Sequence, residues 1–282
     1  MKTVAVLGGG GTGCMMAADN ALRGNSVRLW EDQAFFNENL SEIKESGGIE
    51  VVGNAISGFA KIPMLTSDMA QAVQDADVVL IAAMAERHKS ICQKLAPLLR
   101  SGQTVCFSAG NSSSITLKKM LHYGQDVVVG EMSGNCYPCR IVGKAKVSSA
   151  FPYKPKPAAA FPAQDNARFV SGLDGVYQCI AIQNVLEATL NSPNLVIHIA
   201  GSLLNAGAID KDPEFKLYKQ GITKNTVNVM EKVEDEKIRV MKTMGYNPVL
   251  HVPMLHRVMD YDNHPELALF RMVSGPSGMS HR

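Results

Sequence analysis

The chain has 282 residues and a mass of 30.4 kDa, a length that suggests two domains. Apolar residues make up 46% of the chain and charged residues 19%, which excludes a disordered or collagen-like protein. The 28 basic side chains nearly balance the 26 acidic ones, leaving a formal net charge of +2. With so even a balance, neither nucleic acid nor an anionic membrane is expected as the main partner.

Segments typical of membrane insertion, secretion or metal binding are not evident in the sequence. The longest strongly apolar run, 78–85, is too short to cross a bilayer, and no signal-peptide cleavage pattern follows the first apolar residues. Six cysteines are few for a disulfide scaffold. Cys136 and Cys139 form one C-x-x-C pair, but a zinc site needs a second pair of ligands, so reduced thiols and no metal are expected. We expect a soluble, cytoplasmic protein.

Short apolar runs and amphipathic segments alternate through the first 130 residues. Strands are predicted at 3–7, 27–30, 49–52, 64–66, 78–83, 104–108 and 127–130. Helices are predicted at 12–23, 35–46, 69–73, 89–99 and 117–121. This alternation is typical of a doubly wound parallel sheet with helices on both faces, which binds its ligand at the carboxyl ends of the strands.

The composition changes in the second half of the chain. Residues 144–162 contain four prolines, which predicts edge strands joined by a hairpin because proline is tolerated there and not in a central strand. A last strand is predicted at 177–182, and from Asn184 onward the pattern is helical. We therefore predict an α/β protein with a Rossmann dinucleotide-binding domain at 1–184 and an all-α substrate domain at 185–282.

A glycine-rich loop follows the first predicted strand. Gly8, Gly10 and Gly13 satisfy the pattern G-x-G-x-x-G. In such a loop the first glycine permits a tight turn, the second lets the backbone approach a pyrophosphate, and the third lets the helix pack close to the strand. Gly11 and Thr12 would add the free N–H groups of a helix N-terminus. The loop's place between a strand and a helix predicts a dinucleotide site.

Glu31 closes the second predicted strand, about 20 residues beyond the glycine loop, where this class of site places an acidic residue. Its carboxylate would accept hydrogen bonds from a ribose 2′-hydroxyl and would repel a 2′-phosphate. No arginine lies between Glu31 and Phe36, so NAD is favoured over NADP, with NADP as the alternative. The competing interpretation of Glu31 is a solvated strand end.

A polar stripe runs along an otherwise apolar helix predicted between Ser192 and a stop at Gly207. At about 100° per residue, Asn194, His198 and Asn205 fall on one narrow face. A buried polar face needs partners, and one candidate partner is a substrate or a nicotinamide. An imidazole there could transfer protons, whereas the alternative is a histidine satisfied within the core.

These residues resemble a known family. The order N-x3-H-x6-N of Asn194, His198 and Asn205 is similar to the opening of the helical domain of opine dehydrogenases, the octopine and nopaline dehydrogenase group that includes N-(1-carboxyethyl)-amino-acid dehydrogenases. Further similar positions are Glu131, Cys139 and Arg140 upstream, and 221–223, 231–233, 275–276 and 281–282 downstream. The resemblance covers nearly the whole chain.

The resemblance implies reductive joining of an amino acid amine to an α-keto acid, often pyruvate, with reduction of the imine by NAD(P)H. By the same resemblance His198 would be the acid/base group, with Asn194 and Asn205 orienting the substrate or the helix. Arg140 is a candidate partner for a substrate carboxylate, since a guanidinium pairs bidentately with one. A homodimer is one option for the assembled state.

Three features depart from the family pattern. The family's D-x-E-R is replaced by Glu234-Asp235-Glu236-Lys237, and lysine lacks the bidentate fork of arginine. Met84 replaces the proline after the strand at 78–83, and His88 nearby becomes a secondary catalytic candidate. The family also continues beyond Arg282, where an aspartate pairs with the catalytic histidine, so the helical domain is expected to be incomplete.

Two alternatives remain beside the opine-type enzyme. A ketopantoate or 2-keto-acid reductase shares the Rossmann-plus-helical plan but relies on a lysine early in the helical domain, and no lysine occurs between Lys156 and Lys211. A dinucleotide-binding protein without catalysis is the other alternative. Burial of His198 away from a cleft would favour it.

Overall fold

A computed structural model describes residues 1–54, 56–260 and 263–264 of the chain. The chain divides into two compact units, the first being Met1–Thr189 and the second beginning at Leu190. The predicted domain boundary after residue 184 lies a few residues before this division. The predicted motif residues at 275–276 and 281–282 lie outside the described part of the chain.

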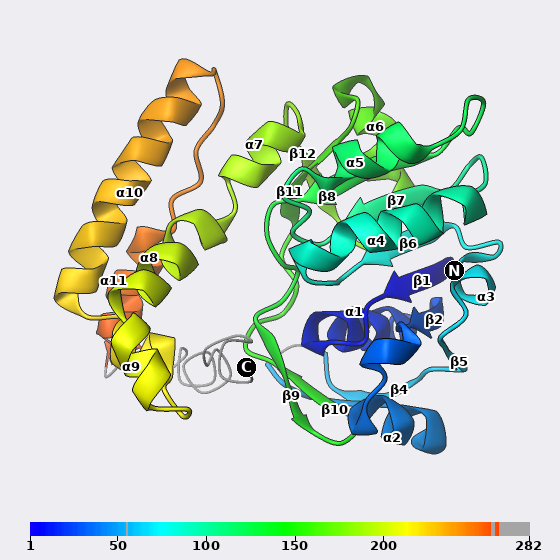
Figure 1. The fold of residues 1–282 in the computed structure, drawn as a ribbon, viewed down its shortest axis with the longest axis horizontal. Helices are drawn as coiled ribbons and strands as arrows, with labels where there is room; N and C mark the ends of the chain where they lie inside the picture. Colours follow the sequence, from blue (N-terminus) through cyan, green and yellow to red (C-terminus); the bar gives the residue numbers. More distant parts are fainter. Residues whose placement is uncertain (55, 261–262, 265–282) are drawn as a thin grey trace. The chain divides into compact units, whose positions relative to one another are not determined.

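The first unit is built on a large, mostly parallel sheet (Figure 1). Its strands, in chain order, are β1 (Thr3–Leu7), β2 (Ser26–Trp30), β5 (Met64–Thr66), β6 (Val78–Ile81), β7 (Thr104–Phe107), β8 (Val128–Met132), β11 (Lys156–Ala160) and β12 (Cys179–Ala181). In space they follow the order β12-β11-β8-β7-β6-β1-β2-β5. The strand order reverses at β1, and in open α/β sheets ligands bind at such a switch point.

Helices cover both faces of this sheet. They are α1 (Gly11–Leu22), α2 (Glu38–Ser46), α3 (Met69–Val73), α4 (Ala85–Leu95), α5 (Ser113–Met120) and α6 (Asn166–Gly172), with 3₁₀ turns at Gln33–Phe35, Ala96–Leu98 and Ala163–Asp165. Helix α7 (Val185–Leu190) follows β12 in the chain. One core joins alternate strand residues to α1, α2 and α6, and a second core joins the intervening residues to α3, α4 and α5. The predicted doubly wound α/β fold is therefore confirmed.

A second, smaller sheet lies beside α1 and was not predicted. It has the order β4-β3-β10-β9, from β3 (Gly48–Gly53), β4 (Gly58–Lys61), β9 (Cys139–Gly143) and β10 (Lys146–Ser149). The strand predicted at 49–52 belongs to this sheet rather than to the parallel one, because β3 pairs antiparallel with β4 and parallel with β10. The hairpin predicted within 144–162 lies earlier, where β9 and β10 pair antiparallel.

The prediction of edge strands for all of 144–162 is wrong for β11. This strand lies inside the large sheet, antiparallel to β8 and parallel to β12. Pro157 is tolerated there because it precedes the first residue paired with β8, and its carbonyl still accepts a hydrogen bond from the Ser133 N–H at 2.8 Å. The missing proline N–H therefore falls at the end of the ladder.

The second unit is helical. It contains a 3₁₀ turn, η4 (Pro193–Leu195), then α8 (Ile197–Leu204), α9 (Ala206–Lys211), a π-helical turn η5 (Leu217–Gly221), α10 (Lys224–Thr243) and α11 (Val252–Met259). Among the described residues, no helix combines the length and apolar character that a membrane span requires.

The single helix predicted from Ser192 to Gly207 is wrong in two respects. Ser192 caps η4 rather than an α-helix, its side chain accepting a hydrogen bond from the Asn194 N–H. Gly207 does not end a helix, because it lies within α9 and Asn205 forms the junction between α8 and α9. The capping pattern at Ser192 and Pro193 is equally compatible with a 3₁₀ turn, so the sequence could not separate the two.

Candidate functional site

The glycine loop occupies the carboxyl end of β1. Gly8 has φ +125°, and a Cβ there would lie 2.6 Å from the Ala82 carbonyl oxygen. A Cβ on Gly13 would lie 1.7 Å from the Gly8 carbonyl oxygen, so only glycine fits at either position. Gly10 differs, since a Cβ there would meet no atom within 4 Å. The backbone at Gly10 therefore borders open space that a ligand could enter.

Helix α1 begins directly at this loop. Its first i→i−4 hydrogen bond runs from the Cys14 N–H to the Gly10 carbonyl at 2.9 Å, so the N–H groups of Gly11, Thr12 and Gly13 precede it. Such N-terminal N–H groups and the positive end of the helix dipole favour an anion. The chain of β9 passes alongside, with the Arg140 Cα 3.8 Å from where a Gly11 Cβ would stand. The structure thus brings Arg140 next to the loop.

Glu31 follows β2 and is buried, with 3% of the residue exposed. Its Oε2 accepts a hydrogen bond from the Gly9 N–H at 2.8 Å, and its Oε1 accepts one from the Asp32 N–H at 2.7 Å. Glu31 is therefore not a solvated strand end. Its carboxylate is fixed against the glycine loop.

An arginine from a distant part of the sequence completes this cluster. Arg87, in the first turn of α4, places its Nη2 at 2.5 Å from Glu31 Oε1 and its Nη1 at 3.3 Å from Glu31 Oε2. Arg87 lies outside the segment between Glu31 and Phe36 on which the expectation of NAD rested, and it was not predicted. A signal was available, because Arg87 follows β6, whose carboxyl end lies beside that of β1.

His88 is buried and bonded within the protein. Only 2% of it is exposed, its Nδ1 lies 2.8 Å from the Ser113 Oγ, and its Nε2 lies 3.0 Å from the Ala83 carbonyl oxygen. Because a carbonyl only accepts, Nε2 carries the proton and Nδ1 accepts from the hydroxyl. Burial lowers the pKa of His88, which favours this neutral form. Both ring nitrogens are thus engaged by the protein, which weakens the case for His88 as a second catalytic group.

The loop between β7 and α5 has an unusual backbone. Ala109, Asn111 and Ser112 all have positive φ, at 60°, 49° and 69°. Left-handed conformations cost a non-glycine residue free energy and persist when surrounding contacts fix them. Although Ser112 precedes α5, its side chain does not cap the helix, and its hydroxyl lies 3.1 Å from the Thr189 Oγ1 instead.

Glu131, in β8, is one of the contacts that fix this loop. Its Oε1 accepts a hydrogen bond from the Ser112 N–H at 3.0 Å, and a Cβ on Gly110 would lie 1.8 Å from its Oε2. Only 1% of Glu131 is exposed. Burial raises its pKa to about 7, with hydrogen bonds from Ser112 and Ser114 opposing the rise. The resemblance had singled out Glu131, but nothing in the sequence indicated this burial.

In the second unit, His198 lies in the first turn of α8 and is partly buried. Its ring packs edge-on against Tyr218 of η5, with the centroids 6.1 Å apart and the planes at 79°. The Asn205 Nδ2 donates to the Gly201 carbonyl at 2.8 Å and to the Gly221 carbonyl at 3.3 Å. Asn205 thus ties α8 to η5, whereas Asn194 stands apart from the α-helix in η4.

The altered family motif on α10 forms a buried ion pair. Lys237 Nζ lies 3.4 Å from Glu234 Oε1, and Nζ also donates to the Val249 carbonyl at 2.6 Å. Glu234 accepts hydrogen bonds from the His251 and Val252 N–H groups at 2.7 Å and 3.1 Å, at the start of α11. The mixed charges of residues 231–237 suggest a solvated helix face with i,i+4 pairing, but both partners of this pair are buried.

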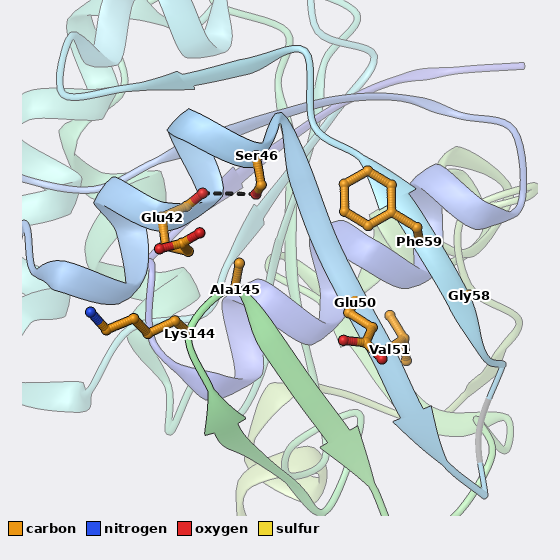
Figure 2. Close-up of a pocket in the computed structure, with 8 residues that line it drawn as sticks. All are labelled: Glu42, Ser46, Glu50, Val51, Gly58, Phe59, Lys144 and Ala145. Carbon is orange, nitrogen blue, oxygen red and sulfur yellow. Dashed lines mark hydrogen bonds between the residues drawn. The ribbon is translucent and has the colours of Figure 1, made fainter.

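A surface pocket lies away from all of these groups. Figure 2 shows it between α2 and the small sheet, with the carboxylates of Glu42 and Glu50 and the amine of Lys144 around it. None of the residues predicted from the sequence as catalytic, cofactor-binding or substrate-binding lines it. Its position beside the small sheet, rather than at the carboxyl ends of the parallel strands, separates it from the candidate dinucleotide site.

Comparisons with known proteins give matches for both the N-terminal part and the helical part of the chain. Residues 181–271 match the family described as NAD/NADP octopine/nopaline dehydrogenase, alpha-helical domain. Residues 3–110 match the N-terminus of NAD-dependent glycerol-3-phosphate dehydrogenase. An opine dehydrogenase from Arthrobacter sp. (strain 1C) is 33% identical over 250 residues, which cover 87% of this chain and 69% of that protein.

Solved structures show the same fold at low identity. An octopine dehydrogenase in complex with NADH and agmatine has a TM-score of 0.64 at 19% identity, over 98% of this chain and 75% of the other. An NADP⁺-bound yersinopine dehydrogenase has a TM-score of 0.65 at 17% identity, over 98% of this chain and 76% of the other. Further octopine dehydrogenase structures are described as complexes with NADH and pyruvate, or NADH and L-arginine.

A dinucleotide-binding sheet with this glycine loop, joined in sequence to a helical domain of this kind, defines an NAD(P)-dependent oxidoreductase that acts on CH–NH donors. More particularly, the chain belongs to the opine dehydrogenase family.

Proposed function

We propose that this protein catalyses reductive N-alkylation of an amino acid by an α-keto acid. The amine and the keto carbonyl condense to an imine with loss of water, and the imine takes up a hydride and a proton to give a secondary amine. The observation that carries the proposal is the 33% identity to an opine dehydrogenase over 87% of the chain. The helical-domain match at residues 181–271 supports it independently of the glycine loop.

The glycine loop fits a nicotinamide dinucleotide on the chain's own geometry. The open space at Gly10 and the leading N–H groups of α1 would hold the pyrophosphate through Gly10, Gly11, Thr12 and Gly13. Glu31, fixed at the end of β2, would accept from the ribose hydroxyls, which favours NAD over NADP. The bound cofactor supplies the hydride.

The chain supplies the proton chemistry and the orientation of the substrates. The His198 imidazole would give a proton to the imine nitrogen and accept it again in the reverse direction. Asn205 keeps α8 in place through its hydrogen bonds to Gly201 and Gly221, while Asn194 would orient substrate. Arg140, whose backbone passes beside the glycine loop, would pair through its guanidinium with a substrate carboxylate.

The relatives suggest which substrates to offer. Octopine dehydrogenase structures are described with pyruvate and with L-arginine, so pyruvate is the keto acid of choice and basic amino acids come first in a panel of amines. NADH oxidation should require both the amine and the keto acid. Oxidation with keto acid alone would instead support a 2-keto-acid reductase, and no oxidation with any pair would support a dinucleotide-binding protein without catalysis.

A single substitution separates catalysis from cofactor binding. His198→Ala should lower kcat by about 100-fold or more, the range expected for loss of a general acid, while leaving the Kd for NADH within about twofold. His256→Ala is the matched control, because His256 lies in the same unit, is exposed and pairs with Glu231 at 2.9 Å. Unchanged kcat in His198→Ala, or a parallel loss of NADH binding, would contradict the assigned role.

A further inference from the structure

Arg87 lies at the carboxyl edge of the large sheet, next to the glycine loop and Glu31. It extends from α4, which follows β6, to Glu31 at the end of β2, and the strand between β6 and β2 is β1, which leads into the glycine loop. Two groups far apart in sequence therefore meet at the carboxyl edge of the sheet. In this class of fold, the ribose that carries the 2′-hydroxyl or 2′-phosphate lies next to the acidic residue after the second strand.

The Arg87 guanidinium is held in a defined orientation. Its two terminal nitrogens face the two oxygens of Glu31, at 2.5 Å and 3.3 Å. Its Cζ lies 3.9 Å from the centroid of the Phe35 ring, a cation–π contact that covers one face of the guanidinium. Only 14% of the Arg87 side chain is exposed. The guanidinium has five N–H donors, and the pair with Glu31 uses those at one end only, so the remaining donors are held in a fixed position from which they can donate to a phosphate.

The negative charge of Glu31, in contrast, is largely balanced by groups of the protein itself. Its oxygens already accept from the Gly9 and Asp32 N–H groups, and Arg87 balances its charge. An acidic residue at this position discriminates against NADP by repelling the 2′-phosphate. Repulsion by a carboxylate already paired with a guanidinium is much weaker than repulsion by a free one.

We propose that Arg87 is a specificity-determining residue that offers a partner to the 2′-phosphate and so allows this protein to bind NADP(H) as well as NAD(H). The inference rests on the proposed function, which puts a dinucleotide on the glycine loop. Glu31 and Arg87 then act in opposition: the ribose hydroxyls of NADH would take the place of Arg87 N–H groups on Glu31, whereas the additional phosphate of NADPH would pair with Arg87.

The neighbouring charges do not provide the same arrangement. Lys94, two turns further along α4, pairs with Asp32 at 2.5 Å, and 55% of its side chain is exposed. It lacks the planar fork and the aromatic contact that fix Arg87. Arg100 pairs with Asp75 at 3.2 Å on the surface, with 69% of its side chain exposed, so Arg100→Gln is a matched loss of one paired arginine.

The test is a double-mutant cycle read by dinucleotide affinity. The Kd values for NADH and NADPH are measured by fluorescence titration for wild type, Arg87→Gln, Glu31→Gln, the double variant and Arg100→Gln. Arg87→Gln should weaken NADPH binding by about tenfold or more and change NADH binding by less than about twofold. Glu31→Gln should strengthen NADPH binding by about tenfold, because it releases Arg87 from the ion pair, and the double variant should lose that gain.

Three outcomes would overturn the inference. If Arg87→Gln weakens the binding of NADH and NADPH equally, the role of Arg87 is only to hold α4 against the end of β2. If the double variant keeps the NADPH affinity of Glu31→Gln, another group holds the phosphate. Wild type that binds neither dinucleotide would overturn the proposed function as well, whereas retained NADH binding in the first two cases confines the failure to Arg87. Arg100→Gln should match wild type for both dinucleotides.

Discussion

Two kinds of glycine stand in the loop after β1. Gly8 and Gly13 are required by the fold, since side chains there would run into the carbonyls of Ala82 and Gly8. Gly10 is not, because it has φ −76°, which any residue can adopt, and open space where its side chain would be. We therefore propose that the glycine at position 10 serves a ligand that comes close to the backbone.

Gly10→Ala should consequently separate folding from binding. We expect the melting temperature to stay within about 2 °C of wild type, because the new methyl group contacts nothing in the protein. The Kd for NADH should rise by about tenfold or more, because the methyl group would stand where the pyrophosphate approaches. Gly13→Ala is the contrasting variant and should lose stability. Unchanged NADH affinity in Gly10→Ala would place the cofactor elsewhere.

Glu131 gives the protein a pH-dependent stability term. Its folded pKa of about 7 lies above the ordinary value of 4.5, so the folded state binds its proton more tightly than the unfolded state. The stabilisation by that proton is complete below about pH 4.5 and is lost as the pH rises through 7, by roughly 3 kcal/mol in all. The carboxyl group therefore destabilises the folded protein most in alkaline solution.

Glu131→Gln should remove this dependence. Glutamine keeps an oxygen to accept from the Ser112 N–H and carries no charge. Between pH 5 and pH 8, the free energy of unfolding of the variant should rise relative to wild type by about 2 to 3 kcal/mol, measured by urea denaturation. Glu50→Gln, which removes an exposed carboxylate of β3, controls for the loss of one charge. Parallel pH profiles for Glu131→Gln and wild type would refute a buried, titrating Glu131.

Among the elements, α10 and α11 depend on the buried pair of Glu234 and Lys237. Glu234 accepts from the leading N–H groups of α11 as well as from Lys237, so removing Glu234 leaves Lys237 without its counter-charge and these N–H groups without this acceptor. Burial lowers the pKa of Lys237, and Glu234 opposes this shift. Breaking a buried pair from one side costs about 3 to 5 kcal/mol.

Glu234→Ala should therefore lower the free energy of unfolding by about 3 kcal/mol or more, measured by chemical denaturation of the full chain. Asp235→Ala, at the adjacent exposed position of α10, should change it by less than about 0.5 kcal/mol. Lys237→Arg restores the residue of the family pattern and should be tolerated better than Glu234→Ala. Equal effects for Glu234→Ala and Asp235→Ala would show that the pair does not join the two helices.

The elements that sequence analysis predicted well are those with a strong local pattern. Strand β1 was predicted at its observed bounds, and α3 was too, because buried parallel strands and capped helices leave signals within a few residues. The small sheet was missed because β3 and β10 are far apart in sequence and pair across that distance. The interruption between η4 and α8 was missed because a 3₁₀ turn and an α-helix begin with the same capping residues.

In the candidate site, too, the contacts predicted from the sequence are local and those that were missed join distant segments. The glycine loop and Glu31 belong to one βαβ unit, so their spacing alone predicted that they meet. Arg87 is 56 residues from Glu31 in the sequence and was missed. The burial of His88 and Glu131 depends on contacts with Ser113 and Gly110, from other elements, which no local pattern indicates.

The reaction proposed for the whole molecule joins two substrates and reduces the imine between them. The glycine loop by itself would suit many dehydrogenases. The helical-domain match and the identity to an opine dehydrogenase are what favour imine reduction over reduction of a keto acid. The two reactions differ in whether the C=N bond of the imine or the C=O bond of the keto acid receives the hydride, and an isotope can follow this difference.

The most direct measurement uses NADH carrying deuterium at both positions of nicotinamide C4, with pyruvate and an amino acid that supports turnover. We expect a secondary amine with one deuterium on the carbon that was the keto carbon, formed only when both substrates are present. Deuterated lactate, formed at the same rate with and without the amino acid, would contradict it.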